Sequence, residues 1–303
     1  MTLRVIRLDE IRSVVKPQLV FDAVRSALIA HTEGRTQVPL PMVLDFPAAS
    51  GDCHVKAGYV EGSPHFTVKI ASTFASVNNG LMLVVDATTG EPAAVLADEG
   101  RLTAWRTAAA GALITDAMTP ADVEEILVLG TGDQARLQAS WLTHLRPSLR
   151  FQIWGRRPEA VTKLVDKLQA SGIEARPRLG ADGSTPSCVI ATTPATSPLP
   201  LELFRDAVHV TGVGTDMPGK GELPPGIFAG ATVVTDDHEQ CLDHGDFGNA
   251  VRAGVIGDDV DRSVGAVLRD GFPRRTERSI ADLTGLGVQD AATASAVIAA
   301  LGR

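Results

Sequence analysis

Glycines and small side chains at a predicted strand-to-helix turn are the first residues that indicate ligand binding. The apolar run Ile126-Leu127-Val128-Leu129 is followed at once by Gly130-Thr131-Gly132-Asp133-Gln134-Ala135. A GxGxxA pattern between a predicted strand and a predicted helix is typical of a dinucleotide-binding turn. Gly130 permits the sharp turn, Gly132 lets a pyrophosphate approach the backbone, and Ala135 permits close packing of helix on strand. The free N–H groups at the helix start then favour phosphate binding.

The end of the next predicted strand indicates which dinucleotide binds. Residues 149–154 are followed by Gly155-Arg156-Arg157, where an NAD-selective site carries an acid for the ribose hydroxyls. A guanidinium at this place can form paired hydrogen bonds with a 2′-phosphate. We therefore predict a preference for NADP(H) over NAD(H), although a solvated arginine pair at the start of a helix is the alternative.

Three cations and one acid stand where they could bind and protonate a small polar substrate. Lys56 and Lys69 each lie in an otherwise apolar β segment, and an inward lysine indicates an anion site because lysine is seldom buried without a partner. Arg106 lies early in a predicted helix, beside an alanine run that allows another surface to approach. Asp216 follows a predicted strand in a glycine-rich loop, a position that favours function. The alternatives are solvated lysines, a structural salt bridge for Arg106, and a turn-forming role for Asp216.

The first of two predicted domains is discontinuous in sequence. Residues 8–33 have a helical pattern, and residues 38–97 change to short apolar or alternating segments bounded by glycine, proline and asparagine. A small-residue helix over 289–301 is expected to return to this domain. We therefore predict a smaller α+β substrate-binding and dimerisation domain formed by residues 1–118 with 281–303.

The second predicted domain, residues 119–280, alternates strands with helices. This alternation is typical of a doubly wound (Rossmann) parallel sheet, so the predicted fold class is α/β. Thr192 and Thr193 directly follow the predicted strand 188–191 and are assigned to the cofactor site. We expect the chemistry to lie outside the carboxyl ends of the parallel strands, in the cleft between the two domains.

Composition excludes several classes of function. The chain has 303 residues and a formal net charge of −8, which suits two domains and argues against nucleic acid as a partner. No apolar run approaches the length of a membrane span, so no membrane partner is predicted. Three cysteines without a close pair, and an N-terminus without the apolar stretch of a secretory signal, predict reduced thiols in the cytoplasm.

Five ordered motifs resemble the ornithine cyclodeaminase/mu-crystallin family over nearly the whole chain. They are Phe66-Thr67-Val68-Lys69-Ile70, Leu102-Thr103-Ala104-Trp105-Arg106-Thr107-Ala108-Ala109, Gly130-Thr131-Gly132-Asp133-Gln134-Ala135, Asp216-Met217-Pro218-Gly219-Lys220-Gly221-Glu222-Leu223 and Gly285-Leu286-Gly287-Val288-Gln289-Asp290. The resemblance implies a dimer with a nicotinamide cofactor and hydride exchange at the Cα of an amino acid or its imine. It also implies that Lys69 and Arg106 hold the substrate carboxylate, and that Asp216 handles the reacting amine or a proton. Asp216 and Lys69 are thus the predicted catalytic residues, and no metal site is predicted.

Two departures from the cyclodeaminase pattern concern charged residues. The arginine that the family carries upstream of Lys69 is missing from residues 41–47. Where ornithine enzymes carry a glutamate for the second amino group, an ungapped count reaches Lys56, which would repel a diamine. A realignment by a few residues would bring Glu61 into that place, so both alignments stay open.

Three functions are compatible with these residues. The first is an imine or ketimine reductase or amino-acid dehydrogenase that uses NADP(H). The second is a lyase that converts L-ornithine to L-proline and ammonia with internally recycled NAD, and the third is a non-catalytic NADP(H)-binding protein like mu-crystallin. Because a lyase regenerates its own cofactor and needs no reduced pool, Arg156 and Arg157 favour the reductase. The presence of Lys69, Arg106 and Asp216 argues against the non-catalytic protein.

Overall fold

The computed structural model describes residues 3–74, 77–272 and 277–302. It divides into two compact units: unit 1 comprises Met1–Ala109 and Leu286–Arg303, and unit 2 comprises Ala110–Gly285. Residues 1 and 303, the predicted ends of the first domain, lie outside the described residues. Among the helices that the structure describes, none is both long and apolar enough to cross a bilayer.

The first boundary between the units falls inside helix α3 (Arg101–Met118) and not at its end, where the sequence analysis placed it. The second half of α3 packs within unit 2, because the hydroxyl groups of Thr115 on α3 and Thr211 on the parallel sheet are 2.8 Å apart. The helix therefore contributes its first half, which carries Arg106, to unit 1 and its second half to unit 2.

Unit 1 is built around a seven-stranded sheet in its described part, in the order β1-β7-β6-β5-β4-β2 with β3 paired to β4. The strands are β1 (Arg4–Arg7), β2 (Thr36–Gln37), β3 (Met42–Phe46), β4 (Gly51–Val60), β5 (His65–Phe74), β6 (Val77–Asp86) and β7 (Pro92–Ala97). The helices wholly inside unit 1 are α1 (Leu8–Val14), α2 (Pro17–Thr32) and α9 (Gly287–Leu301). Neighbouring strands are antiparallel except β1 and β7. The helical pattern of residues 8–33 and the short β segments of residues 38–97 are present, and β1 and β2 lie outside those predicted segments.

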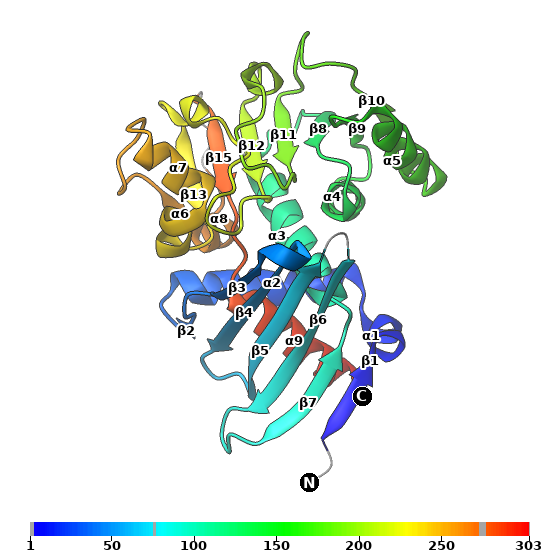
Figure 1. The fold of residues 1–303 in the computed structure, drawn as a ribbon, viewed down its shortest axis with the longest axis vertical. Coiled ribbons are helices and arrows are strands. Elements are labelled where there is room, and N and C mark those ends of the chain that lie inside the picture. Colours follow the sequence, from blue (N-terminus) through cyan, green and yellow to red (C-terminus); the bar gives the residue numbers. More distant parts are fainter. Residues whose placement is uncertain (1–2, 75–76, 273–276, 303) are drawn as a thin grey trace. The chain divides into compact units, whose positions relative to one another are not determined.

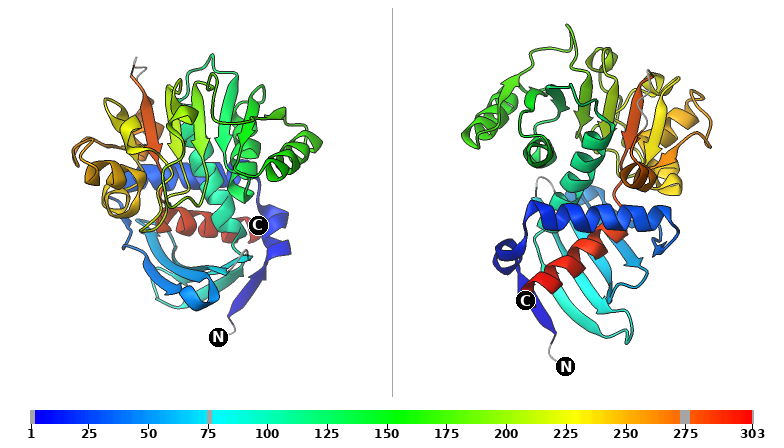
Figure 2. Two further views of the ribbon diagram at one scale, coloured as in Figure 1. Left: turned by 45° about the horizontal axis from the view of Figure 1, so that its top comes forward. Right: turned by 180° about the vertical axis from the view of Figure 1, so that it is seen from behind.

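The two faces of the unit 1 sheet have opposite character. Helix α9 contacts β4, β5 and β6, and α2 packs beside α9 (Figure 2). This covered face has an apolar core that includes Met82, Val84 and Leu96. On the opposite face, large apolar side chains are exposed; those on the strands include Met42, Leu44, Phe46, Ile70, Phe74, Val77 and Leu81. Because side chains alternate along a strand, Lys69 lies on the covered face and Ile70 on the exposed one.

Unit 2 contains the predicted doubly wound sheet. Its eight described strands are parallel and have the order β10-β9-β8-β11-β12-β15-β13-β14 (Figure 1). The strands are β8 (Glu125–Leu129), β9 (Arg150–Trp154), β10 (Ala175–Pro177), β11 (Cys188–Ala191), β12 (His209–Gly212), β13 (Thr232–Thr235), β14 (Arg262–Ser263) and β15 (Ser279–Asp282). The helices are α4 (Asp133–Leu145), α5 (Pro158–Ala170), α6 (His238–His244), α7 (Asp246–Arg252) and α8 (Val264–Asp270). The chain reverses its direction of winding between β8 and β11, and ligands bind beyond the strand ends at such a switch point.

Strand β15 was not predicted, and it moves the second domain boundary from residue 280 to residue 285. Its sequence Ser-Ile-Ala-Asp has no apolar run, so it carries no strand signal. It nevertheless lies between β12 and β13, where its polar end residues Ser279 and Asp282 have hydrogen-bond partners. The hydroxyl of Ser279 is 2.9 Å from Nδ1 of His209, and Asp282 accepts a 2.8 Å hydrogen bond from the N–H of Phe247.

Candidate active site

The glycine turn after β8 has the geometry of a phosphate cradle. Gly130 has a φ of 126°, and a Cβ added to it would lie 2.5 Å from Oγ1 of Thr192, so only glycine fits. A Cβ added at Gly132 would have no heavy atom of a described residue within 4 Å, so this backbone is open to a ligand. Gly132 immediately precedes α4, and no described side chain caps that helix start. The residues present therefore fit a dinucleotide pyrophosphate.

Thr192 and Thr193 have different roles at the end of β11. The N–H and the hydroxyl of Thr192 both donate to the carbonyl of Leu129, at 2.9 and 3.0 Å. Thr192 therefore ties the ends of β11 and β8 together beside Gly130. The N–H and hydroxyl of Thr193 instead donate to Oε2 of Glu222, at 2.7 and 3.0 Å.

A basic pocket of about 510 Å³ adjoins the glycine turn within unit 2. It is lined by Thr131, Gly132, Asp133, Arg136, Arg157, Glu159, Ala160, Lys163, Leu164 and Lys167. Four cations thus face two acids, and one of those acids, Asp133, pairs with Arg136 at 2.8 Å. Of the two predicted arginines, Arg157 lines the pocket, while Arg156 is exposed and is not among the lining residues. Gly155 permits the close approach of Thr131 in the glycine turn, because a Cβ added to Gly155 would lie 2.6 Å from Cγ2 of Thr131.

Unit 1 contains a buried ionic cluster that joins β5, α3 and α9. Nζ of Lys69 lies 2.8 Å from Oδ2 of Asp290, and Nε of Arg106 lies 2.8 Å from Oδ1 of the same carboxylate. Nη1 of Arg106 donates to Oε1 of Gln289 at 3.0 Å. Lys69, Arg106 and Asp290 are 2%, 4% and 1% exposed, so this is a desolvated group of charges and not a surface salt bridge.

The electrostatics of the cluster follow from burial and from mutual pairing. Burial lowers the pKa of Lys69; the negative charge of Asp290 opposes this shift, and the positive charge of Arg106 adds to it. Burial alone would raise the pKa of Asp290, but the positive charges of Arg106 and Lys69 outweigh it and hold that pKa below its usual value. Burial raises the pKa of Asp98, which precedes α3, to about 6. Oδ2 of Asp98 accepts the N–H of Leu102 at 2.8 Å.

Lys56 belongs to the same part of unit 1. The register of the antiparallel pair β4 and β5 places Lys56 directly opposite Lys69, so the two side chains share the covered face. Lys56 is 6% exposed. Glu61, by contrast, is exposed in the turn after β4, where its N–H donates to the carbonyl of Arg35 at 2.9 Å. The residue opposite Lys69 on the neighbouring strand is therefore Lys56, while Glu61 lies beyond the end of β4.

Asp216 lies in unit 2, in the loop after β12. Its Oδ1 is 2.6 Å from Nζ of Lys220, and its side chain is 45% exposed. The loop is anchored by buried Glu222, whose Oε1 accepts the N–H groups of Gly214 (2.7 Å) and Val213 (3.2 Å). Burial, reinforced by the nearby charge of Asp246, raises the pKa of Glu222 to about 7.

The sequence analysis assigned Lys56, Lys69 and Arg106 to substrate binding, and the structure places Lys56 opposite Lys69 and pairs Lys69 and Arg106 with one carboxylate. Sequence reasoning missed that carboxylate, Asp290, and the loop anchor Glu222. Both lie inside motifs that the sequence analysis quoted. A usable signal existed for Asp290, because it is the one charged residue in the apolar helix Gly287–Leu301. Glu222 carried no signal, since its partners are backbone N–H groups of its own loop and the N–H and hydroxyl of Thr193 after β11.

Comparisons with known proteins agree with this geometry. The model of the ornithine cyclodeaminase/mu-crystallin family matches residues 4–301. An uncharacterized cyclodeaminase of Sinorhizobium fredii is 33% identical over 317 residues, covering 97% of this chain and 94% of that protein. An archaeal alanine dehydrogenase dimer with bound NAD is 26% identical, with a TM-score of 0.89 over 99% of this chain and 96% of that one. The iminosuccinate reductase of Paracoccus denitrificans in complex with NAD⁺ is 25% identical, with a TM-score of 0.88 over 98% of this chain and 96% of that one.

Proposed function

The chain belongs to the ornithine cyclodeaminase/mu-crystallin family, and we propose that it is a nicotinamide-dependent oxidoreductase acting at the Cα of an amino acid or its imine. The observation that carries this proposal is the buried cluster of Lys69, Arg106 and Asp290 in a chain that also has the glycine turn. Desolvated cations of this kind suit a small carboxylate substrate. When bound, the reduced nicotinamide supplies a hydride, and the oxidised form accepts one in the reverse direction.

In this proposal Arg106 and Lys69 bind the substrate carboxylate while Asp290 holds both cations in place. Asp290 and Gln289 engage Nε and Nη1 of Arg106. The third nitrogen, Nη2, donates to no described residue, and we assign it to the carboxylate. The C=N carbon gains the hydride, the π electron pair moves onto nitrogen, and one proton completes the amine. Asp216 is assigned to hold the amine and to exchange that proton.

The proposed reaction is a reduction of an imine or the reverse dehydrogenation, and not the cyclisation of ornithine. A cyclodeaminase must hold a second ammonium group, and the residue opposite Lys69 is a lysine. The test is to incubate the protein with NADPH and cyclic ketimines, and separately with NAD⁺ and ornithine. Stoichiometric oxidation of NADPH supports the reductase. Proline formation from ornithine without net change in the cofactor would establish the lyase instead.

We propose NADP(H) as the preferred cofactor because of the basic pocket beside the glycine turn. NADPH should bind more tightly than NADH by about 1–3 kcal/mol, the scale of charge-assisted hydrogen bonds to a phosphate. Arg157→Asp should abolish this difference, measured by fluorescence titration. Arg156→Asp makes the same charge change outside the pocket lining and should have a smaller effect. Equal affinities of the wild type for NADPH and NADH would contradict the proposal.

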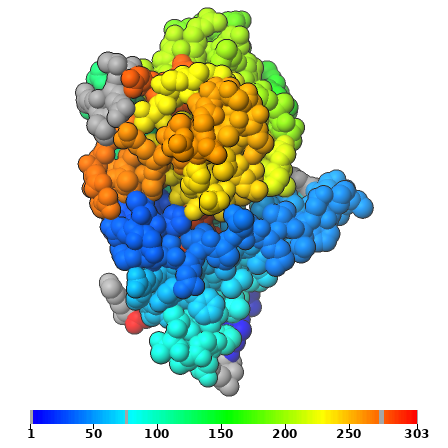
Figure 3. Space-filling view, turned by 90° about the vertical axis from the view of Figure 1, so that its left-hand side faces the viewer, coloured from blue at the N-terminus to red at the C-terminus, as the bar shows by residue number. Residues whose placement is uncertain are grey.

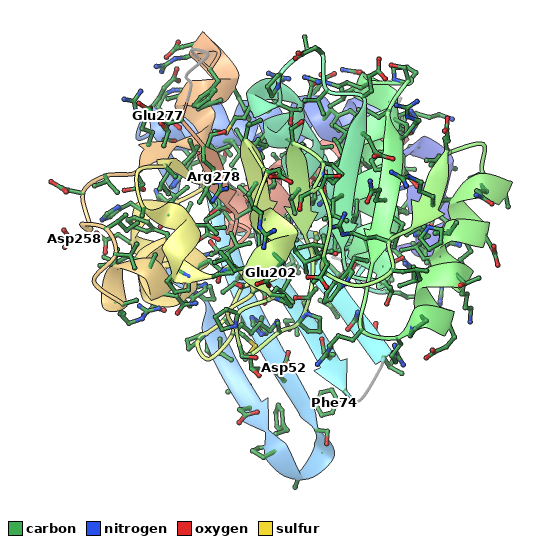
Figure 4. The ribbon with its side chains drawn as sticks, turned by 90° about the horizontal axis from the view of Figure 1, so that it is seen from above. Asp52, Phe74, Glu202, Asp258, Glu277 and Arg278 are labelled. Carbon is green, nitrogen blue, oxygen red and sulfur yellow. The ribbon has the colours of Figure 1, made fainter. Side chains whose placement is uncertain are left out.

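We propose that the exposed apolar face of unit 1 forms a homodimer. The β3–β4 hairpin projects from the rest of the unit (Figure 3). At its end, the ring of Phe46 lies 5.4 Å, centroid to centroid, from that of Phe74, which Figure 4 labels. An exposed apolar surface of this kind on a sheet marks an association site.

The dimer proposal predicts the effect of one charge on this face. Ile70→Glu should convert the protein to a monomer of 31.8 kDa. Dimerisation would then bury a carboxylate beside Val55 and Leu81, the apolar neighbours of Ile70 on the adjacent strands. Light scattering at micromolar concentration measures this. Leu179→Glu, on an equally apolar residue exposed in unit 2, should leave the dimer intact. A monomeric wild type would refute the proposal.

The three cysteines support a reducing compartment. Cys53, Cys188 and Cys241 are all free, and burial raises the pKa of Cys188 to about 12, which makes it an inert thiol. We therefore assign the enzyme to the cytoplasm.

A further inference from the structure

A buried glutamate of unit 2 bridges two loops that follow neighbouring strands. Glu222 is fully buried, and both oxygens of its carboxylate accept hydrogen bonds. Oε2 accepts the N–H and the hydroxyl of Thr193, just after β11. Oε1 accepts the N–H groups of Val213 and Gly214, just after β12. Because β11 and β12 are adjacent and parallel (Figure 1), both loops leave the same edge of the sheet, and Glu222 holds them together there.

The two loops also touch at the backbone beside this carboxylate. A Cβ added to Gly214 would lie 2.2 Å from the carbonyl oxygen of Thr193 and 2.8 Å from Oε2 of Glu222. A larger residue in this position would therefore push the loops apart. At the other end of the loop after β12, the N–H of Gly221 donates to the carbonyl of Ala195 at 2.9 Å. Both ends of this loop are thus fixed to the chain that follows β11.

Asp216 lies between these two fixed ends. Its Oδ1 accepts a 2.6 Å hydrogen bond from Nζ of Lys220 in the same loop. The hydroxyl of Thr215 donates to Oδ2 of Asp246 at 2.8 Å, and the N–H of Glu222 donates to Oδ1 of that carboxylate at 3.1 Å. Asp246 therefore fixes the loop to α7, whereas the Glu222 carboxylate fixes it to the end of β11. The position of Asp216 relative to the end of β11 thus depends on Glu222.

The end of β11 belongs to the proposed cofactor site. Thr192 donates to the carbonyl of Leu129 from both its N–H and its hydroxyl, beside Gly130 of the glycine turn. The direction of winding reverses between β8 and β11, and a dinucleotide binds beyond the ends of the strands at such a point. Glu222 therefore connects the proposed cofactor site with the loop that carries Asp216.

We propose that Glu222 is a positioning residue, which holds Asp216 in the place that proton transfer beside the bound cofactor requires. This inference rests on the proposed function, because it adds a second residue to the proton-transfer step assigned to Asp216. Glu222 is buried, so it acts through the loop and not on the substrate. Binding of NADP(H) at the end of β11 then also orders the Asp216 loop, since the carboxylate joins the two loops.

The kinetic test replaces Glu222 by glutamine, which has nearly the same shape. An amide has one acceptor oxygen and one NH2 donor, so it can satisfy the donors of only one of the two loops. We expect kcat to fall by about 10- to 100-fold, the range for losing buried hydrogen bonds to a charged group, while KM changes little. The solvent deuterium isotope effect on kcat should increase, because a displaced Asp216 slows proton transfer relative to hydride transfer.

Three further variants separate positioning from folding. In the Asp216→Asn background, Glu222→Gln should lower kcat no further, because Glu222 acts through Asp216. Thr193→Val removes one donor to Glu222 and should change kcat and the isotope effect in the same directions, by less. Glu174→Gln, at an exposed glutamate of the same unit, should leave both quantities unchanged. Wild-type kcat in Glu222→Gln would overturn the inference. So would a loss that recurs in full in the Asp216→Asn background with an unchanged isotope effect, which is the mark of damaged folding.

Hydrogen–deuterium exchange with and without NADPH provides a readout that does not depend on turnover. In the wild type, NADPH should slow the exchange of the amides of residues 213–216. In Glu222→Gln this protection should be lost, while protection of the glycine turn remains. Protection of residues 213–216 that persists in Glu222→Gln would contradict the coupling of the two loops. If no imine is reduced, the proposed function fails, while loss of this protection in Glu222→Gln would still support the coupling.

Discussion

Replacing Arg106 by lysine is expected to lower kcat/KM by about 10²-fold or more, although the positive charge is kept. The guanidinium makes two hydrogen bonds within unit 1, from Nε to Asp290 and from Nη1 to Gln289, and offers Nη2 to the substrate. The side chain of lysine has a single nitrogen and cannot replace all three guanidinium nitrogens of Arg106. Either Asp290 or the substrate carboxylate therefore loses its hydrogen bond from residue 106, although Asp290 still pairs with Lys69. Steady-state kinetics with the preferred imine measures the loss.

The controls for this variant separate binding of substrate from folding. NADPH affinity should be unchanged, because the glycine turn and the basic pocket belong to unit 2. Arg12→Lys, in an exposed position on α1, should retain full activity. A second variant, Asp290→Asn, removes the shared counter-ion and should raise KM more than it lowers kcat, because it loosens both cations without removing either. Wild-type kinetics in Arg106→Lys would exclude Arg106 from the substrate site.

Replacing Asp216 by asparagine is expected to lower kcat by about 10²–10⁴-fold, the usual cost of losing a group that transfers a proton in the transition state. Asparagine has nearly the same shape but cannot accept or release a proton. The side chain is 45% exposed and pairs with Lys220, so its replacement should cost little stability. The rate of NADPH oxidation under saturating substrate measures the effect.

Two comparisons make this result specific to Asp216. Asp258→Asn, an exposed aspartate of the same unit (Figure 4), should leave turnover unchanged. Lys220→Met removes the ion pair but keeps the carboxylate, so it should retain most of the activity. Turnover near the wild-type value in Asp216→Asn would move the proton-transfer role to a water molecule or to Lys56.

Most of the architecture could be predicted from local patterns. Alternating apolar residues predicted β4 to β7, and the glycine turn behind an apolar run predicted β8 and α4. These elements are decided by contacts between near neighbours in the chain, so their periodicity is visible in the sequence. Strand β15 was missed because a four-residue strand with polar ends has no periodicity to read; its partners β12 and β13 give it stability.

The sequence by itself determined the chemical groups of the site: the glycine turn, the arginines after β9, and the cations Lys56, Lys69 and Arg106. Only the tertiary structure decided which of these groups lie together. Asp290 reaches Lys69 and Arg106 because α9 returns across the chain to the sheet that holds them. The register of β4 and β5 places Lys56, and not Glu61, opposite Lys69. Arg157 lines the basic pocket, whereas Arg156 does not. Each of these contacts joins residues that are far apart in the sequence, and local propensities do not encode such long-range contacts.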